Sequence, residues 1–284
     1  MRLVFDLFKL RIGFAIALTA LAGAMVAPSS AGPGQVIVIV LAVLVASAAA
    51  GAFNQYVEAD LDRRMQRTRG RVFATGRFTR HGGWLALIAA LVGGATIAAA
   101  SLVNPVAALY TFLGAFFYGV VYTVWLKRRT AMNIVVGGLA GSFAVMAGAA
   151  AISPLAALTP LPLAFAWILF LWTPPHFWSL AIVCRRDYAA AGVPMLPVVV
   201  GDSRAARAIL ASGWLLVVAS FVPALFGLHL VYLAFAAAGG AYFLLRCHEL
   251  VRRPGRMPAR KAFLASLVQL SAVLLGAMAD VAIF

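Results

Sequence analysis

The sequence predicts an all-α membrane protein, in which nine transmembrane helices form a single domain over residues 1–284. Three observations predict this fold. Hydrophobic residues make up 64% of the chain and charged residues only 11%, whereas a soluble domain carries about 25% charged residues. The mean hydropathy is +0.99, and the apolar residues gather in runs long enough to cross a bilayer. All 23 basic residues fall in alternate connections between these runs.

The first four spans are predicted from apolar runs and the turns that divide them. The first, residues 12–28, follows a short basic arm and could also be the core of a signal peptide. Its apolar part is long enough to cross a bilayer, which favours a retained helix. The second, residues 36–56, begins after the turn sequence PSSAGPG. The third and fourth, residues 83–102 and 105–125, are divided by VNP, which is typical of a turn.

The remaining five spans contain more small residues and prolines. The fifth, residues 132–152, is rich in Gly and Ala, which suit close packing of helices in lipid. The sixth, residues 160–183, contains Pro174 and Pro175. Because prolines remove backbone donors, we expect them to kink or break this helix. The last three spans follow from apolar length and are residues 206–227, 229–246 and 262–282.

The basic residues predict how the bundle is oriented. They occur in the N-terminal arm and in the loops after the second, fourth, sixth and eighth spans. With nine spans, all of these segments lie on one side of the membrane. The positive-inside rule makes that side cytoplasmic, so we expect a cytoplasmic N-terminus and an outside C-terminus in a bacterial inner membrane. The net charge of +15 is therefore a topology signal, and nucleic acid is not an expected partner.

The sequence NQYVEADLDRRMQRTRG, at the end of the second span, gathers scarce carboxylates. Asn54, Glu58 and Asp62 are spaced four residues apart, so they share one helix face, whereas Asp60 points elsewhere. Three oxygen-bearing side chains at the membrane edge suit Mg²⁺, which usually holds a substrate phosphate with one or two carboxylates. The alternative is a solvated helix end that balances its own arginines.

Basic and aromatic residues near this motif are candidates for binding phosphate. The arginines that follow the motif, with Lys127 and Arg128 of another loop, could hold phosphate oxygens. Tyr122 and Lys127 end the fourth span in YTVWLKRRTAMN. The alternative for this patch is an aromatic and basic anchor at the membrane interface.

The sixth span ends in a second polar stretch, WTPPHFWSLAIVCRRDYAAAGVPMLPVV. His176 is expected inside the membrane, where an ionisable residue is a functional hypothesis by default. Asp187 lies eleven residues further on, at nearly the same helical angle, so both side chains can face one cavity if the helix continues. The alternative is a histidine bonded to backbone groups that the prolines leave free.

Together these motifs resemble those of a known family. The first acidic motif is similar to that of the UbiA-type intramembrane prenyltransferases. The sequences YTVWLKRRTAMNIVVGGLAG and WTPPHFWSLAI, with DYAAAGVPMLPVV, resemble more narrowly the protohaem IX farnesyltransferases within them. The resemblance implies a nine-helix bundle with a central cavity, in which two acidic motifs bind Mg²⁺ and farnesyl diphosphate. It implies transfer of the farnesyl group to a vinyl group of haem b, with addition of water, to give haem O and diphosphate.

The resemblance also implies roles for particular residues. The expected metal ligands are Asn54, Glu58, Asp62 and Asp187. The expected contacts with diphosphate or haem are Arg67, Arg71, Tyr122, Lys127, Arg128 and His176. The residues expected to be catalytic are Asp62, Asp187, Lys127 and His176.

Two other functions remain open. A UbiA-type transferase could use another acceptor, such as an aromatic quinone precursor. A small-molecule transporter would place ionisable groups near the bilayer centre and carry an internal repeat. The expected partners of the transferase are membrane lipid and its two substrates, with a haem A synthase or a terminal oxidase as a further candidate.

Overall fold

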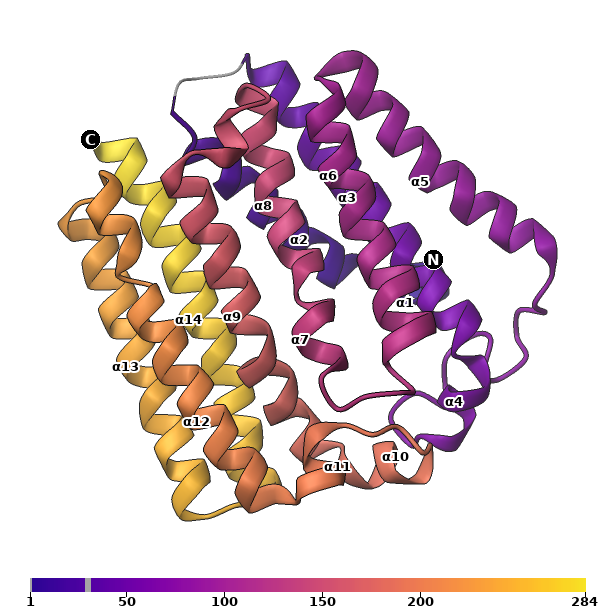
Figure 1. Ribbon diagram of the computed structural model, residues 1–284. Coiled ribbons are helices and arrows are strands. Elements are labelled where there is room, and N and C mark those ends of the chain that lie inside the picture. Colours follow the sequence, from indigo (N-terminus) through magenta and orange to yellow (C-terminus); the bar gives the residue numbers. More distant parts are fainter. Residues whose placement is uncertain (1, 29–31) are drawn as a thin grey trace.

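A computed structural model describes residues 2–28 and 32–284, and these ranges are helical with no strand (Figure 1). Within them, eight helices are long and apolar enough to cross a membrane. The eight are α3 (Pro33–Val57), α5 (Gly82–Leu102), α6 continued by the π-helix η1 (Pro105–Leu126), α7 with α8 (Asn133–Ile152), α9 (Pro160–Val183), α12 continued by η3 (Asp202–Phe226), α13 (Leu230–Arg252) and α14 (Arg256–Ile283).

The first predicted span is shorter than the other eight. It corresponds to α2 (Leu10–Met25), an apolar helix of 16 residues. The end of the predicted span reaches residue 28, and the turn after it includes residues 29–31, which lie outside the described part of the chain. Four short α-helices and one short 3₁₀-helix complete the helical segments, and they are α1 (Arg2–Leu7), α4 (Ala59–Arg64), α10 (Arg185–Ala190), α11 (Leu196–Val200) and η2 (Ala156–Leu158).

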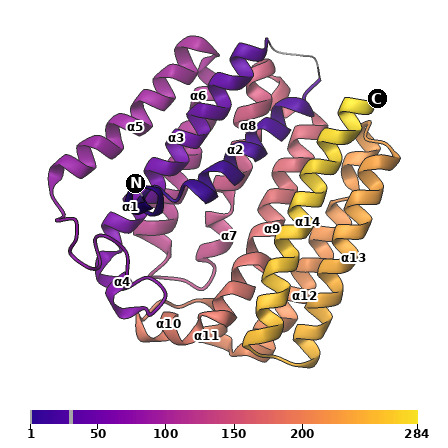
Figure 2. The same ribbon diagram turned by 180° about the vertical axis from the view of Figure 1, so that it is seen from behind.

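The long helices form two groups that differ in how they pack (Figures 1 and 2). Large side chains of α9, α12, α13 and α14 form one hydrophobic core. Alanines dominate the second core, which joins α2, α3, α6 and α8. In that second group, a Cβ atom added at Gly148 would lie 1.8 Å from the backbone oxygen of Ala20. The α2 and α8 backbones are therefore in direct contact, as small residues allow in lipid.

The loops rich in arginine lie at one end of the bundle, which we call the basic end. It contains the loop and short helices after α3, the loop 127–132, the α10–α11 segment and the connection between α13 and α14 (Figure 1). The C-terminus lies at the opposite end. The charge partition that the sequence predicts thus corresponds to one end of the folded bundle.

The sequence predicts that the two prolines of α9 kink or break it, and the helix is not broken. The helix runs from Pro160 to Val183 with Pro174 and Pro175 inside it. Packing against α12 on one side and α14 on the other supports the helix, and Thr173 and Ser179 donate hydrogen bonds to carbonyl groups one turn before them. Helices buried among other helices tolerate prolines for this reason.

Candidate active site

A cavity of about 530 Å³ opens at the basic end of the bundle. Its walls come from the N-terminal segment, α2, α3, α6 with η1, α8, α9 and the loop 65–72. The end near α4 is polar, whereas the deeper part between α2, α3, α6 and α8 is lined by small and apolar side chains. A molecule with a charged head and an apolar tail fits such a shape.

The acidic motif lies at the polar end of this cavity. Asn54, Glu58 and Asp62 all line it, and they are only 3%, 1% and 1% exposed. Helix α3 ends at Val57 and α4 starts at Ala59. The break is slight, so the backbone N–H of Asp62 still bonds the carbonyl of Glu58 and the expected helical phase is kept.

Asp60 points away from the cavity. Its side chain is 57% exposed and lies 3.4 Å from both Arg63 and Arg80. Ion pairs as exposed as these contribute little to stability. The two carboxylates of α4 therefore have opposite surroundings, because Asp62 is buried in the cavity and Asp60 lies in solvent.

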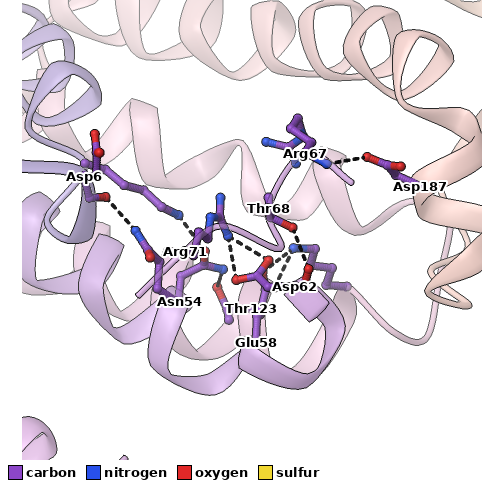
Figure 3. A network of polar contacts seen from close by, with 12 residues as sticks. Asp6, Asn54, Glu58, Asp62, Arg67, Thr68, Arg71, Thr123 and Asp187 are labelled. Carbon is purple, nitrogen blue, oxygen red and sulfur yellow. Dashed lines mark hydrogen bonds and ion pairs between the residues drawn. The ribbon is translucent and has the colours of Figure 1, made fainter. Parts of the chain in front are cut away.

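Each oxygen-bearing group of the motif has a basic partner from another segment (Figure 3). The Lys127 Nζ lies 2.5 and 2.6 Å from the two carboxylate oxygens of Glu58. The Arg71 guanidinium donates to both oxygens of Asp62, at 2.9 and 3.0 Å. The Lys9 Nζ donates to Asn54 Oδ1 at 2.6 Å. The basic partners thus come from the loop after η1, the loop after α4 and the N-terminal arm.

Lys9 is a residue of this site that the sequence reasoning missed. It joins α1 to α2 in the left-handed region, with φ 49°, a conformation that costs a residue with a side chain about 1–3 kcal/mol. The Gln55 side chain fixes the arm by donating to the carbonyls of Asp6 and Leu7. Burial, followed by the charge of Arg71, holds the pKa of Lys9 well below its ordinary value. The only available signal was its membership of the short basic arm.

The other expected contacts with phosphate divide into two groups. Arg67, Arg71, Tyr122 and Lys127 line the cavity. Arg128 is exposed and is not among the described lining residues, although it follows Lys127 directly. The structure therefore does not support the expected contact between Arg128 and substrate, because this side chain is exposed and outside the described lining.

Asp187 lies beside the cavity and not in its lining. Helix α9 ends at Val183, and Asp187 belongs to α10, so the helical angle that was expected to align it with His176 does not apply. Its two carboxylate oxygens accept hydrogen bonds from the backbone N–H groups of Gln66 and Arg67, at 3.2 and 3.1 Å. Figure 3 shows Asp187 next to Arg67, so this carboxylate fastens the loop that carries the arginine.

His176 lies between α9 and α14, away from the described lining of the cavity. Its ring stacks on Trp172 and Phe263, and its Nδ1 lies 2.7 Å from Ser266 Oγ. The Ser266 hydroxyl also lies 2.7 Å from the Phe263 carbonyl, so the tautomer of His176 sets which of the two partners donates in the contact with Ser266. The expected haem contact finds no support here, and the partner is a hydroxyl, not a backbone carbonyl freed by the prolines.

The donor set at the polar end fits a hard cation that is shared with a phosphate. Among the described residues, no group of three or more His, Cys, Asp or Glu side chains could hold a metal ion. Glu58 and Asp62 supply two carboxylates and Asn54 an amide oxygen. Mg²⁺ is usually bound by one or two carboxylates together with substrate phosphates, and not by an all-protein cage.

Comparison with known proteins supports the same class of chemistry. Residues 16–272 match the UbiA prenyltransferase family. The chain is 52% identical to protoheme IX farnesyltransferase 2 of Paramagnetospirillum magneticum, over 99% of this chain and 97% of the relative. It is 46% identical to protoheme IX farnesyltransferase 1 of the same organism, over 97% and 96% of the two chains.

Solved structures share the fold at low sequence identity. A digeranylgeranylglyceryl phosphate synthase has a TM-score of 0.81 at 14% identity, over 100% of this chain and 99% of that chain. A UbiA homologue from Archaeoglobus fulgidus, bound to GPP and Mg²⁺, has a TM-score of 0.76 at 16% identity, over 99% of both. From the family match and the identity to these relatives, the chain belongs to the UbiA prenyltransferase family.

Proposed function

We propose that this protein is a protohaem IX farnesyltransferase, which transfers the farnesyl group of farnesyl diphosphate to a vinyl group of haem b. Addition of water completes the product, haem O, and diphosphate is released. The observation that carries the proposal is the buried acidic face of Asn54, Glu58 and Asp62 beside four basic side chains, at the mouth of an apolar cavity. The high identity to two protoheme IX farnesyltransferases supports haem as the acceptor.

The polar end of the cavity would bind the diphosphate. Asn54, Glu58 and Asp62 would hold Mg²⁺, which supplies Lewis-acid stabilisation of the leaving group. Arg67, within reach of the cavity, would hold diphosphate oxygens, since a guanidinium can make two parallel hydrogen bonds to phosphate. Asp187 would keep the Arg67 loop in place through the hydrogen bonds that it accepts from two backbone N–H groups, and a metal contact by Asp187 would share the carboxylate with these two hydrogen bonds.

The deeper part of the cavity would bind the farnesyl chain. Along α3 the lining extends from Glu58 to Val43, a distance of about 22 Å at 1.5 Å per residue. Ile16, Ala46 and Ala144 line this part. Such walls exclude water from an allylic cation until the acceptor carbon has reacted. Tyr118 and Tyr122, which stack on each other at 5.8 Å, stand between the polar and apolar parts.

The proposed topology has nine membrane spans, with α2 as the first. The N-terminus and the basic end face the cytoplasm and the C-terminus faces the opposite side of the bacterial inner membrane. The positive-inside rule supports this orientation, because the arginine-rich loops gather at one end of the bundle. Haem O released from this site would pass to a haem A synthase or a terminal oxidase in the same membrane.

The decisive assay supplies the purified protein with farnesyl diphosphate, Mg²⁺ and either haem b or 4-hydroxybenzoate. We expect a farnesylated, hydrated haem by mass spectrometry and no change in the aromatic acid. Prenylation of the acid with haem left unchanged would replace this proposal by the quinone-precursor function. Full turnover by Asp62→Asn would show that this acidic face does not carry the reaction. Failure of the unmodified protein to change either acceptor would favour a transporter.

A further inference from the structure

The three metal-facing groups of the site are already engaged by cationic side chains. Lys127 contacts both carboxylate oxygens of Glu58, and Arg71 contacts both oxygens of Asp62. Lys9 bonds Asn54 Oδ1. Each basic side chain therefore contacts the oxygen atoms that a metal ion would use.

The Asn54 amide shows that this arrangement is specific. Its Nδ2 donates to Thr123 Oγ1 at 3.1 Å, and Thr123 in turn donates to the carbonyl of Tyr118 at 2.8 Å. These bonds fix the amide so that Oδ1 faces the cavity. The Lys9 ammonium also lies 3.1 Å from the Tyr118 hydroxyl. The Asn54 oxygen has a second lone pair, but a cation that binds it from the cavity lies beside the Lys9 ammonium, and repulsion between the two positive charges favours displacement of Lys9.

We propose that Lys9 is a diphosphate-binding residue, which occupies Asn54 until Mg²⁺ and a diphosphate enter the cavity together. The metal then takes the Asn54 oxygen, and the Lys9 ammonium moves to the diphosphate. Lys127 and Arg71 make the same exchange at Glu58 and Asp62. The inference deepens the proposed function and rests on it, because it assigns a further residue to the same site.

Charge explains why the two ligands should enter together. The described residues that line the cavity include four cationic side chains, Lys9, Arg67, Arg71 and Lys127, and three carboxylates, Asp6, Glu58 and Asp62. A metal ion alone adds positive charge to a site that is already cationic, and displaces ammonium groups that have no other partner. A diphosphate supplies that partner. A ligand that improves the binding of another must itself be bound more tightly in return.

Lys9 is the member of the set on which this exchange is easiest to test. Its partner Asn54 is neutral, whereas Lys127 and Arg71 face carboxylates, so an entering anion provides the opposite charge that half-buried Lys9 lacks at Asn54. Lys9→Met keeps a long side chain on the left-handed backbone and removes the charge. Arg11→Met is the matched control, because Arg11 lies two residues away, is exposed and is not among the described lining residues.

The experiment measures binding to the full chain in detergent and does not depend on turnover. Mn²⁺ serves as the spectroscopic metal, read by electron paramagnetic resonance, and farnesyl thiodiphosphate is the slowly reacting analogue. In the unmodified protein we expect the analogue to tighten Mn²⁺ binding by about 5- to 150-fold, the usual range of such coupling. In Lys9→Met, Mn²⁺ alone should bind more tightly and the analogue alone should bind more weakly, with Arg11→Met unchanged in both.

The opposite changes in the affinity for Mn²⁺ and in the affinity for the analogue distinguish the proposal from simple misfolding, which would weaken the binding of both ligands. Lys9→Gln, which retains a donor for Asn54 without the charge, should also weaken analogue binding. Unchanged analogue binding in both variants, or weaker Mn²⁺ binding in Lys9→Met, would overturn the role of Lys9. Failure of the unmodified protein to bind either ligand would instead overturn the proposed function, and this inference with it.

Discussion

The buried pair between Lys127 and Glu58 offers a direct test of how the site is held together. The two side chains are 10% and 2% exposed, and the ammonium lies within 2.6 Å of both carboxylate oxygens. Lys127→Met leaves a charged Glu58 without its partner in the interior. Removal of one member of a buried pair costs about 3–5 kcal/mol. For a chain of this size, that lowers the apparent Tm by roughly 6–20 °C.

The double variant Glu58→Met, Lys127→Met provides the control. Replacement of both members by apolar side chains is often neutral or stabilising, so we expect the apparent Tm to return to within a few degrees of its original value. Turnover should remain lost, because the double variant lacks both a metal ligand and a phosphate contact. Thermal unfolding in detergent, with farnesyltransferase activity measured in parallel, completes the double-mutant cycle.

Two results would refute this reasoning. If each single substitution costs less than about 1 kcal/mol, the pair behaves like a solvated surface pair. If the two costs add in the double variant to within about 0.5 kcal/mol, the side chains do not interact. Either result would mean that Glu58 is not enclosed with Lys127 as the structure shows.

Three further substitutions test other features. Asp60→Asn should change kcat/KM by less than about fivefold, because its ion pairs are exposed; a loss of about 10²-fold would mean that the wrong carboxylate faces the cavity. Arg71→Lys should weaken binding of inorganic diphosphate by about tenfold, since an ammonium cannot make the paired contacts of a guanidinium. Unchanged affinity in isothermal titration would mean that Arg71 does not contact the diphosphate. Gly148→Ala should destabilise the protein by about 1–3 kcal/mol in thermal unfolding, because the added Cβ meets the α2 backbone. The control Gly93→Ala, with no atom within 4 Å of the added Cβ, should stabilise the protein by about 0.5–1 kcal/mol. Equal effects of the two substitutions would contradict the close α2–α8 contact.

Eight of the nine predicted spans correspond to helices of the described chain that are long and apolar enough to cross a membrane, because bilayer thickness sets the length of a span. The sixth predicted span, residues 160–183, has the same limits as α9. The last two spans differ more, since α13 continues to Arg252 and α14 begins at Arg256. Helical hydrogen bonds do not stop where the hydrocarbon ends, so hydropathy underestimates helices that extend into the aqueous layer.

The acidic face was predicted because it is a local property, and Arg71 and Lys127 were expected near it as phosphate contacts, whereas Lys9 was missed. Helical phase alone separates Asp60 from Asp62, and it needs only a few residues of sequence. Lys9 reaches Asn54 across 45 positions of sequence, and no local pattern reports such a contact. A shared cavity of His176 and Asp187 was expected only if the helix continued between them, and helical phase does not extend across Cys184, where α9 ends.

The π-helix η1 (Phe117–Leu126) makes the site depend on the exact number of residues in one segment. The backbone N–H of Lys127 bonds the carbonyl of Tyr122, five residues earlier, whereas an α-helix would use the residue four positions before. Deletion of one residue from η1 would allow an ordinary α-helix to form and would turn Lys127 by about 100° about the helix axis. The ammonium would then leave Glu58 although every side chain of the site was still present. Length in this segment is therefore as much a part of the site's chemistry as its side chains.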